Sequence, residues 1–137
     1  MYATILIPVD LEHADQLEKA MVTAGDLARA RGARLHVVGV TAALPGAAAH
    51  NPAEFGEKLK AWAGDWAGRL GLDVASHVLV TGDPQTEMDD RILAHAHEIG
   101  ADLIVMATRV PGFAERIFGS HGGRLAAQAD ISVFLVR

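Results

Sequence analysis

Short runs of apolar residues are spaced along the whole chain. Five of them are rich in β-branched side chains and predict strands, at residues 3–9, 35–40, 73–80, 103–106 and 131–136. The first, second and fourth runs are apolar at almost every position, as in parallel strands that are covered on both faces. The third run alternates more clearly between apolar and polar residues, which suits a strand near the edge of the sheet.

Between these runs, apolar residues recur at the spacing of one helix face. Such stripes cover residues 17–28, 55–70 and 88–99, and a shorter helix fits residues 120–127. Gly32, Gly71 and Gly100 stand where the first three helices should end. Strands and helices therefore alternate throughout. This alternation predicts a single α/β domain over residues 1–137, with a doubly wound sheet of five parallel strands and helices on both faces.

Composition narrows the class of protein. Half of the residues are hydrophobic but only 5% are aromatic, so the core must be mainly aliphatic. Trp62 and Trp66 share one helical stripe and are expected in that core rather than as ligand platforms. The chain has no cysteine, which excludes disulfides, thiolate metal sites and cysteine nucleophiles.

Charge and hydropathy bear on location and partners. The first ten residues lack the basic segment of a signal peptide, and no apolar run approaches the roughly 18 residues of a membrane span. We therefore expect a cytoplasmic protein with no membrane partner. The formal net charge of −5 argues against nucleic acid as a partner, because such proteins normally present a basic face.

A ligand of an open α/β sheet is expected outside the carboxyl ends of the strands, where the strand order reverses. The loop after the first strand, Pro8-Val9-Asp10-Leu11-Glu12, has no glycine and carries two acids, which excludes a Rossmann fingerprint and a Walker A loop. The segment after the fourth strand differs. Gly119 and Ser120 open the short helix, whose N–H groups can hold an anion, and Arg109 and Arg116 add positive charge. An ordinary loop with Ser120 as the helix N-cap explains the same residues without a ligand.

Five segments together resemble the universal stress protein family over essentially the whole chain. They are Ile7–Asp10, Leu35–Val40, Gly82–Pro84, Ala101–Met106 and Ile131–Arg137. No single segment is specific to this family, but the order and spacing of all five segments are. The resemblance implies an adenine-nucleotide alpha-hydrolase-like fold with strand order 3-2-1-4-5. It also implies a homodimer, or a higher oligomer, formed through the last strand at residues 131–136.

The nucleotide-binding branch of that family carries Gly-x-x-Gly, nine residues, and then Gly-Ser or Gly-Thr. Here Ala107 stands where the first glycine is expected, no glycine follows three residues later, and the distance to Gly119 is one residue shorter. Residues 108–112 resemble a subgroup that has Ser-His-Arg-Pro in this place and the same shortened spacing. Some members of that subgroup are similar to ATP binders.

The resemblance implies ATP or another adenine nucleotide as the ligand. Asp10 would contact the ribose or a phosphate-bound Mg²⁺, and Val40 would meet adenine through its backbone. The complete candidate site is Pro8, Val9, Asp10, Val40, Met106, Ala107, Arg109, Gly112, Gly119, Ser120 and His121. Met106 and Ala107 would line the pocket, while the last three residues would hold phosphate. The structural alternatives are a helix N-cap for Asp10 and plain core packing for Val40 and Met106.

The seven histidines do not predict a metal site from their spacing. His95 and His97 lie two apart on a predicted helix and point about 200° away from each other. His36 lies within a predicted strand, and His13, His50 and His77 are isolated in the sequence. No catalytic triad or general base can be argued from the sequence, so nothing in it supports an enzyme.

The leading hypothesis is a dimeric stress-response sensor or regulator that acts by binding a nucleotide rather than by turnover. The apolar last strand, at a predicted sheet edge, invites pairing with a second copy. One alternative is an interaction protein that keeps the fold with a degenerate pocket, which the missing Gly-x-x-Gly favours. Another is a slow ATPase or self-phosphorylating protein, for which Gly119-Ser120 is the sequence argument.

Overall fold

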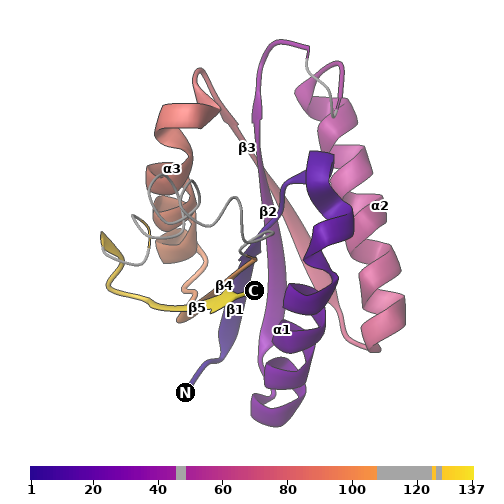
Figure 1. Ribbon diagram of the computed structural model, residues 1–137, viewed down its shortest axis with the longest axis vertical. Helices are drawn as coiled ribbons and strands as arrows, with labels where there is room; N and C mark the ends of the chain where they lie inside the picture. The colour runs from indigo at the N-terminus through magenta and orange to yellow at the C-terminus, as the bar shows by residue number, and fades with distance from the viewer. Residues whose placement is uncertain (46–48, 108–124, 126–127) are drawn as a thin grey trace.

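A computed structural model describes residues 1–45, 49–107, 125 and 128–137. Five parallel strands form one sheet in the order β3-β2-β1-β4-β5 (Figure 1). The strands are β1 (Thr4–Pro8), β2 (Arg34–Ala42), β3 (Val74–Thr81), β4 (Leu103–Ala107) and β5 (Ser132–Val136). The helices are the 3₁₀ helix η1 (Leu11–Leu17), α1 (Glu18–Arg31), α2 (Pro52–Leu70) and α3 (Pro84–Glu98). The doubly wound sheet and its strand order are as the sequence and the family resemblance predict.

The expected boundaries hold to within a few residues. Each predicted strand is present with its ends shifted by at most two residues, and α2 and α3 start slightly earlier than their apolar stripes. The first helical stripe begins in a 3₁₀ helix directly after Asp10 and continues as α1. The short helix predicted over residues 120–127 lies outside the described residues, except that Leu125 is helical and buried.

Helices cover both faces of the sheet. Figure 1 shows α1 and α2 together on one side and α3 on the other. The side chains of Ile5, Ile7 and Val37 pack in the core under α1 and α2. Those of Leu6 and Val38 pack in a second core under α3. Because neighbouring residues of a strand point to opposite faces, the continuous apolar runs fill both cores at once.

Helices α1 and α2 end at glycines in the left-handed conformation. Gly32 has φ 65° and Gly71 has φ 67°, and the N–H of each donates to a carbonyl four residues earlier. Glycine adopts this conformation without the steric penalty of a Cβ atom. At the other end of α2, Asn51 accepts a hydrogen bond from the Glu54 N–H at 2.8 Å. The positions at which these helices stop are thus encoded locally.

The two tryptophans of α2 lie on its sheet-facing side but are buried to different degrees. Trp66 is buried in the core under α1 and α2, whereas Trp62 is only partly buried at the edge of that core. The guanidinium carbon of Arg69 lies 3.9 Å from the ring centroid of Trp66. The prediction that they act as core residues is therefore met fully by Trp66 and partly by Trp62.

Within the part of the chain that the structure describes, no helix is both long enough and apolar enough to cross a membrane.

Candidate functional site

The carboxyl ends of β1, β2 and β4 meet at the middle of the sheet. Strand β1 pairs with β2 on one side and with β4 on the other. The chain leaves β1 towards β2 and β3, and later returns to β4 and β5, so the strand order reverses between β1 and β4. At such a reversal the connecting loops of an open α/β sheet diverge, and a ligand is expected in the crevice between them.

Asp10 lies two residues after the end of β1, at this crevice. Pro8 is the last residue of β1, and the N–H of Val9 donates to the carbonyl of Val38 at 2.8 Å. Val9 is buried, while Asp10 is exposed. The strand therefore holds Val9 in the core and leaves the next side chain at the mouth of the crevice.

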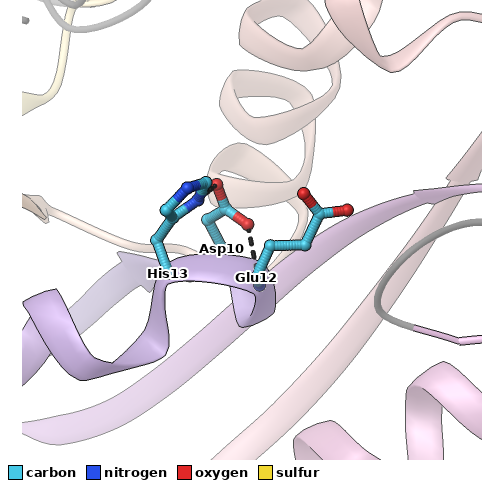
Figure 2. Close-up of side chains that lie close together, drawn as sticks. All are labelled: Asp10, Glu12 and His13. Atoms are coloured by element: carbon cyan, nitrogen blue, oxygen red, sulfur yellow. Dashed lines mark hydrogen bonds and ion pairs between the residues drawn. The ribbon is translucent and has the colours of Figure 1, made fainter.

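Asp10 caps the helix that follows it. Its Oδ1 accepts a hydrogen bond from the Glu12 N–H at 3.0 Å, and its Oδ2 lies 2.9 Å from Nδ1 of His13. Figure 2 shows the His13 ring beside this carboxylate and the Glu12 side chain on the same side of the turn. The N-cap alternative for Asp10 is therefore realised. Capping does not remove the residue from the crevice, because a carboxylate can accept several hydrogen bonds.

The same turn gathers donors for a cation. Within the described residues, Asp10, Glu12 and His13 form the one group of three whose ligand atoms all lie within 4.8 Å of one another. Two carboxylates fit a hard cation such as Mg²⁺, which takes one or two protein oxygens and keeps its waters. The imidazole broadens the choice towards Mn²⁺ and Zn²⁺. A cation here would also offset the repulsion between the two acids and a phosphate.

The backbone of β2 continues past the end of β1. The last register pair of these strands is Pro8 with Val38, whereas β2 runs on to Ala42. The carbonyl of Val38 points towards β1, where it accepts the Val9 N–H. Strand geometry repeats every two residues, so the N–H and C=O of Val40 point to the same side of β2 as the Val38 carbonyl, which is the side of β1. The Val40 side chain meanwhile packs against the core under α3.

The end of β4 forms the opposite wall. Met106 is buried in the core under α3, and Ala107 is partly buried against the core under α1 and α2. Ala107 is the last residue of β4 and pairs with Val136. The structure thus brings Pro8, Val9, Asp10, Val40, Met106 and Ala107 to neighbouring strand ends. For Met106, and for the Val40 side chain, it shows core packing.

The phosphate half of the predicted site is not among the described residues. Arg109, Gly112, Gly119, Ser120 and His121 all fall outside them. The anion site at the start of the short helix therefore stays a prediction.

Two neighbours of Asp10 are not in the predicted site. By its sequence position, Glu12 indicates only a charge that repels phosphate, and His13 is isolated from the other histidines. Their spacing of two and three residues from Asp10 was an available signal, because one tight helical turn brings such positions close together. That turn is η1, which begins directly after Asp10.

Comparison with known proteins gives consistent results. The model of the universal stress protein family matches residues 1–137. Universal stress protein G of Escherichia coli O157:H7 is 30% identical over 152 residues, covering 100% of both chains. A universal stress protein from Archaeoglobus fulgidus, solved in complex with dAMP, is 27% identical with a TM-score of 0.69, covering 99% of this chain and 98% of that chain. A further structure of universal stress protein from Archaeoglobus fulgidus is 26% identical with a TM-score of 0.70, covering 100% of both chains.

Proposed function

The chain belongs to the universal stress protein family, and we propose that it acts by binding an adenine nucleotide at the carboxyl ends of β1, β2 and β4. One observation carries the proposal. Asp10, the backbone of Val40 and the end of β4 at Ala107 converge where the strand order reverses. The relative from Archaeoglobus fulgidus that is in complex with dAMP supports adenine as the base.

Each wall of the crevice suits a different part of the nucleotide. The N–H and C=O of Val40 point beyond the last β1–β2 register pair, where they can pair with the polar edge of adenine. Ala107, which is partly buried at the end of β4, would offer an apolar contact to the base, and the Met106 side chain would support that wall from the core under α3. The Asp10 carboxylate can accept hydrogen bonds from the ribose hydroxyls. Phosphate binding by Gly119, Ser120 and His121, aided by Arg109 and Gly112, is the remaining part of the proposal.

A cation would allow a triphosphate to approach the acidic turn. When bound, a divalent ion such as Mg²⁺ neutralises the phosphate charge. Asp10 and Glu12 would hold that ion, because their carboxylate oxygens lie close together with Nδ1 or Nε2 of His13. We therefore propose that ATP binds here with Mg²⁺, whereas a monophosphate depends less on the ion.

We further propose that the protein is a dimer that pairs through β5. This strand is the last in the sheet formed by the described residues, and Phe134 on it is 43% exposed. A two-fold axis beside β5 would pair two copies of the strand antiparallel and join two sheets into one. The expected role is a cytoplasmic sensor or regulator that senses nucleotide by binding.

The nucleotide proposal is tested by calorimetry with dAMP, AMP and ATP, with and without Mg²⁺. Asp10→Asn removes the charge and keeps an oxygen for the Glu12 N–H, so the helix cap survives. We expect this variant to bind Mg²⁺–ATP at least tenfold more weakly, a loss of about 1.4 kcal/mol. Asp15→Asn is the matched control, because it makes the same charge change at an exposed position of the same helix.

The result can also decide between the alternatives. No heat and no thermal shift with any adenine nucleotide at millimolar concentration would overturn the proposal and favour an interaction protein. ADP release that is lost in Ser120→Ala would instead favour a slow ATPase. Native mass spectrometry of the purified chain gives an independent check, because it reports both a retained nucleotide and the number of copies.

A further inference from the structure

Three histidines that are far apart in the sequence meet under α3. His36 is on β2, His77 is on β3 and His95 is in the last turn of α3. The register pairs His36 with Leu6 and His77 with Val38, and both of those apolar residues lie in the core under α3. The cluster therefore lies between α3 and the β2–β3 edge of the sheet. It lies against the middle of β2 and β3, with His36 level with Leu6 and His77 level with Pro8, whereas Asp10 follows the end of β1.

The three rings are in direct contact. Nδ1 of His36 lies 2.9 Å from Nε2 of His77, and the two rings stack with centroids 5.2 Å apart. The ring centroids of His77 and His95 are 4.6 Å apart. Imidazole binds metal ions in its neutral form, through a ring nitrogen that carries no proton.

His95 supplies a buried ring nitrogen, Nε2, that has no hydrogen-bond partner in the described part of the chain. Its side chain is only 9% exposed, and its buried Nε2 makes no hydrogen bond with any residue that the structure describes. Its Nδ1 faces Oε2 of Glu98 at 3.5 Å, and the carboxylate favours the tautomer with the proton on Nδ1. This tautomer leaves a lone pair on the buried Nε2. A buried polar atom without a partner is costly, so its presence calls for an explanation.

We propose that His36, His77 and His95 bind one divalent transition-metal ion of the zinc type. The donors are Nδ1 of His36, Nε2 of His77 and Nε2 of His95, and a water completes a tetrahedral shell. Three imidazoles with one water is an established ligand set for Zn²⁺, while Mg²⁺ prefers oxygen ligands. Glu98 then orients His95 from the outer shell, as carboxylates commonly do for metal-bound histidines.

Binding requires one proton to shift and the ring of His95 to turn. The metal takes the place of the proton that lies between Nδ1 of His36 and Nε2 of His77. That proton moves to the other nitrogen of the ring that carried it. Both rings stay neutral, and no net proton is lost. The three donor nitrogens are not all within 4.8 Å of one another in this structure, so His95 has to turn about its side-chain bonds. His36 and His77 are both partly exposed, which gives the ion a route from solvent.

The test uses the full chain without a histidine tag. Calorimetry with Zn²⁺ should give a tight site at these three histidines in the wild type, distinct from any binding at Asp10, Glu12 and His13. His36→Gln, His77→Gln and His95→Gln should each weaken that site at least tenfold. Two controls should leave it unchanged. His50→Gln replaces an exposed histidine elsewhere, and His13→Gln disables the separate group at Asp10.

A second measurement avoids variants that fold poorly. In the wild type, ¹⁵N spectra of the imidazoles should show Zn²⁺-induced shifts at His36, His77 and His95, with Nδ1 affected in the first and Nε2 in the other two. The His50 signals should not move. No Zn²⁺ binding, unchanged affinity in any of the three variants with circular dichroism like the wild type, or loss of the site in His13→Gln would overturn the proposal.

Discussion

At the residue scale, the carboxylate of Asp102 fastens the start of β1 to the start of β4. Its two oxygens accept hydrogen bonds from the N–H groups of Ala3, at 2.9 Å, and Thr4, at 3.1 Å. The Asp102 N–H in turn donates to the Thr4 carbonyl at 3.0 Å. Burial alone would raise the pKa of Asp102, but these hydrogen bonds to the charged form outweigh it and lower the pKa.

The lowered pKa makes this contribution to stability pH-dependent. It is fully present above the pKa of about 3.9 in the unfolded chain and is lost as pH falls through the lower pKa of the folded chain. Asp102→Asn should lower the free energy of unfolding by about 1 kcal/mol at pH 7. The difference from wild type should shrink in urea melts taken from pH 5 to pH 2.

Asp73→Asn is the matched control for this prediction, because it removes an exposed carboxylate just before β3. It should leave the free energy of unfolding nearly unchanged. A constant difference between wild type and Asp102→Asn across that pH range would contradict the assigned role.

At the element scale, the close packing of α2 against β2 depends on a glycine, which has no side chain. Gly39 lies on β2 beneath the ring of Phe55 from α2. A Cβ atom at Gly39 would stand 2.6 Å from Cε1 and 2.7 Å from Cζ of that ring. Such distances are well inside van der Waals contact, so the helix or the ring would have to move. Gly39 therefore sets how closely this helix approaches the sheet.

Gly39→Ala should destabilise the protein by about 1–3 kcal/mol, as overpacking of a core usually does. Thermal and urea unfolding measure the effect. Adding Phe55→Leu should recover part of the loss, because the two positions share one contact. Gly64→Ala is the control, and its effect on the free energy of unfolding should have the opposite sign. It lies in α2 with no atom within 4 Å of the new Cβ, and it should gain about 0.5–1 kcal/mol. Wild-type stability in Gly39→Ala would refute the close-contact explanation.

At the scale of the whole molecule, each edge of the sheet exposes one large apolar side chain. Strand β5 carries Phe134, which is 43% exposed, and β3 at the opposite edge carries Val80, which is 40% exposed. Exposed apolar residues on an edge strand favour pairing with another chain. The dimer proposed above uses β5, so the two edges should respond differently to charge.

Phe134→Lys should convert the dimer to a monomer, because two buried lysines would face each other across the two-fold axis. Light scattering after size-exclusion chromatography at micromolar concentration measures the mass. Val80→Lys makes the same change at the other edge and should remain a dimer. A monomeric wild type, or equal loss of dimer in both variants, would rule out pairing through β5.

The elements of this fold could be predicted from the sequence because burial repeats locally. Continuous apolar runs marked strands buried on both faces, and the 3.6-residue stripes marked helices. Gly32 and Gly71 marked two helix ends, and each glycine has the expected left-handed conformation. The order and spacing of short segments, including those that end near Asp10 and Ala107, indicated the family. The same segments indicated which strand ends lie on either side of the crevice. Each of these signals lies within a short window of the chain.

The side-chain clusters were decided only by the tertiary structure. His36 and His77 are 41 residues apart, and they meet because the β2–β3 register sets His77 beside Val38, the residue two positions beyond His36. His95 joins them only because α3 packs on that face of the sheet. Asp10 similarly shares its carboxylate with His13 through a tight 3₁₀ turn that the helical stripe did not predict. A local pattern reports which residues are buried, whereas strand register and helix packing determine which of them meet.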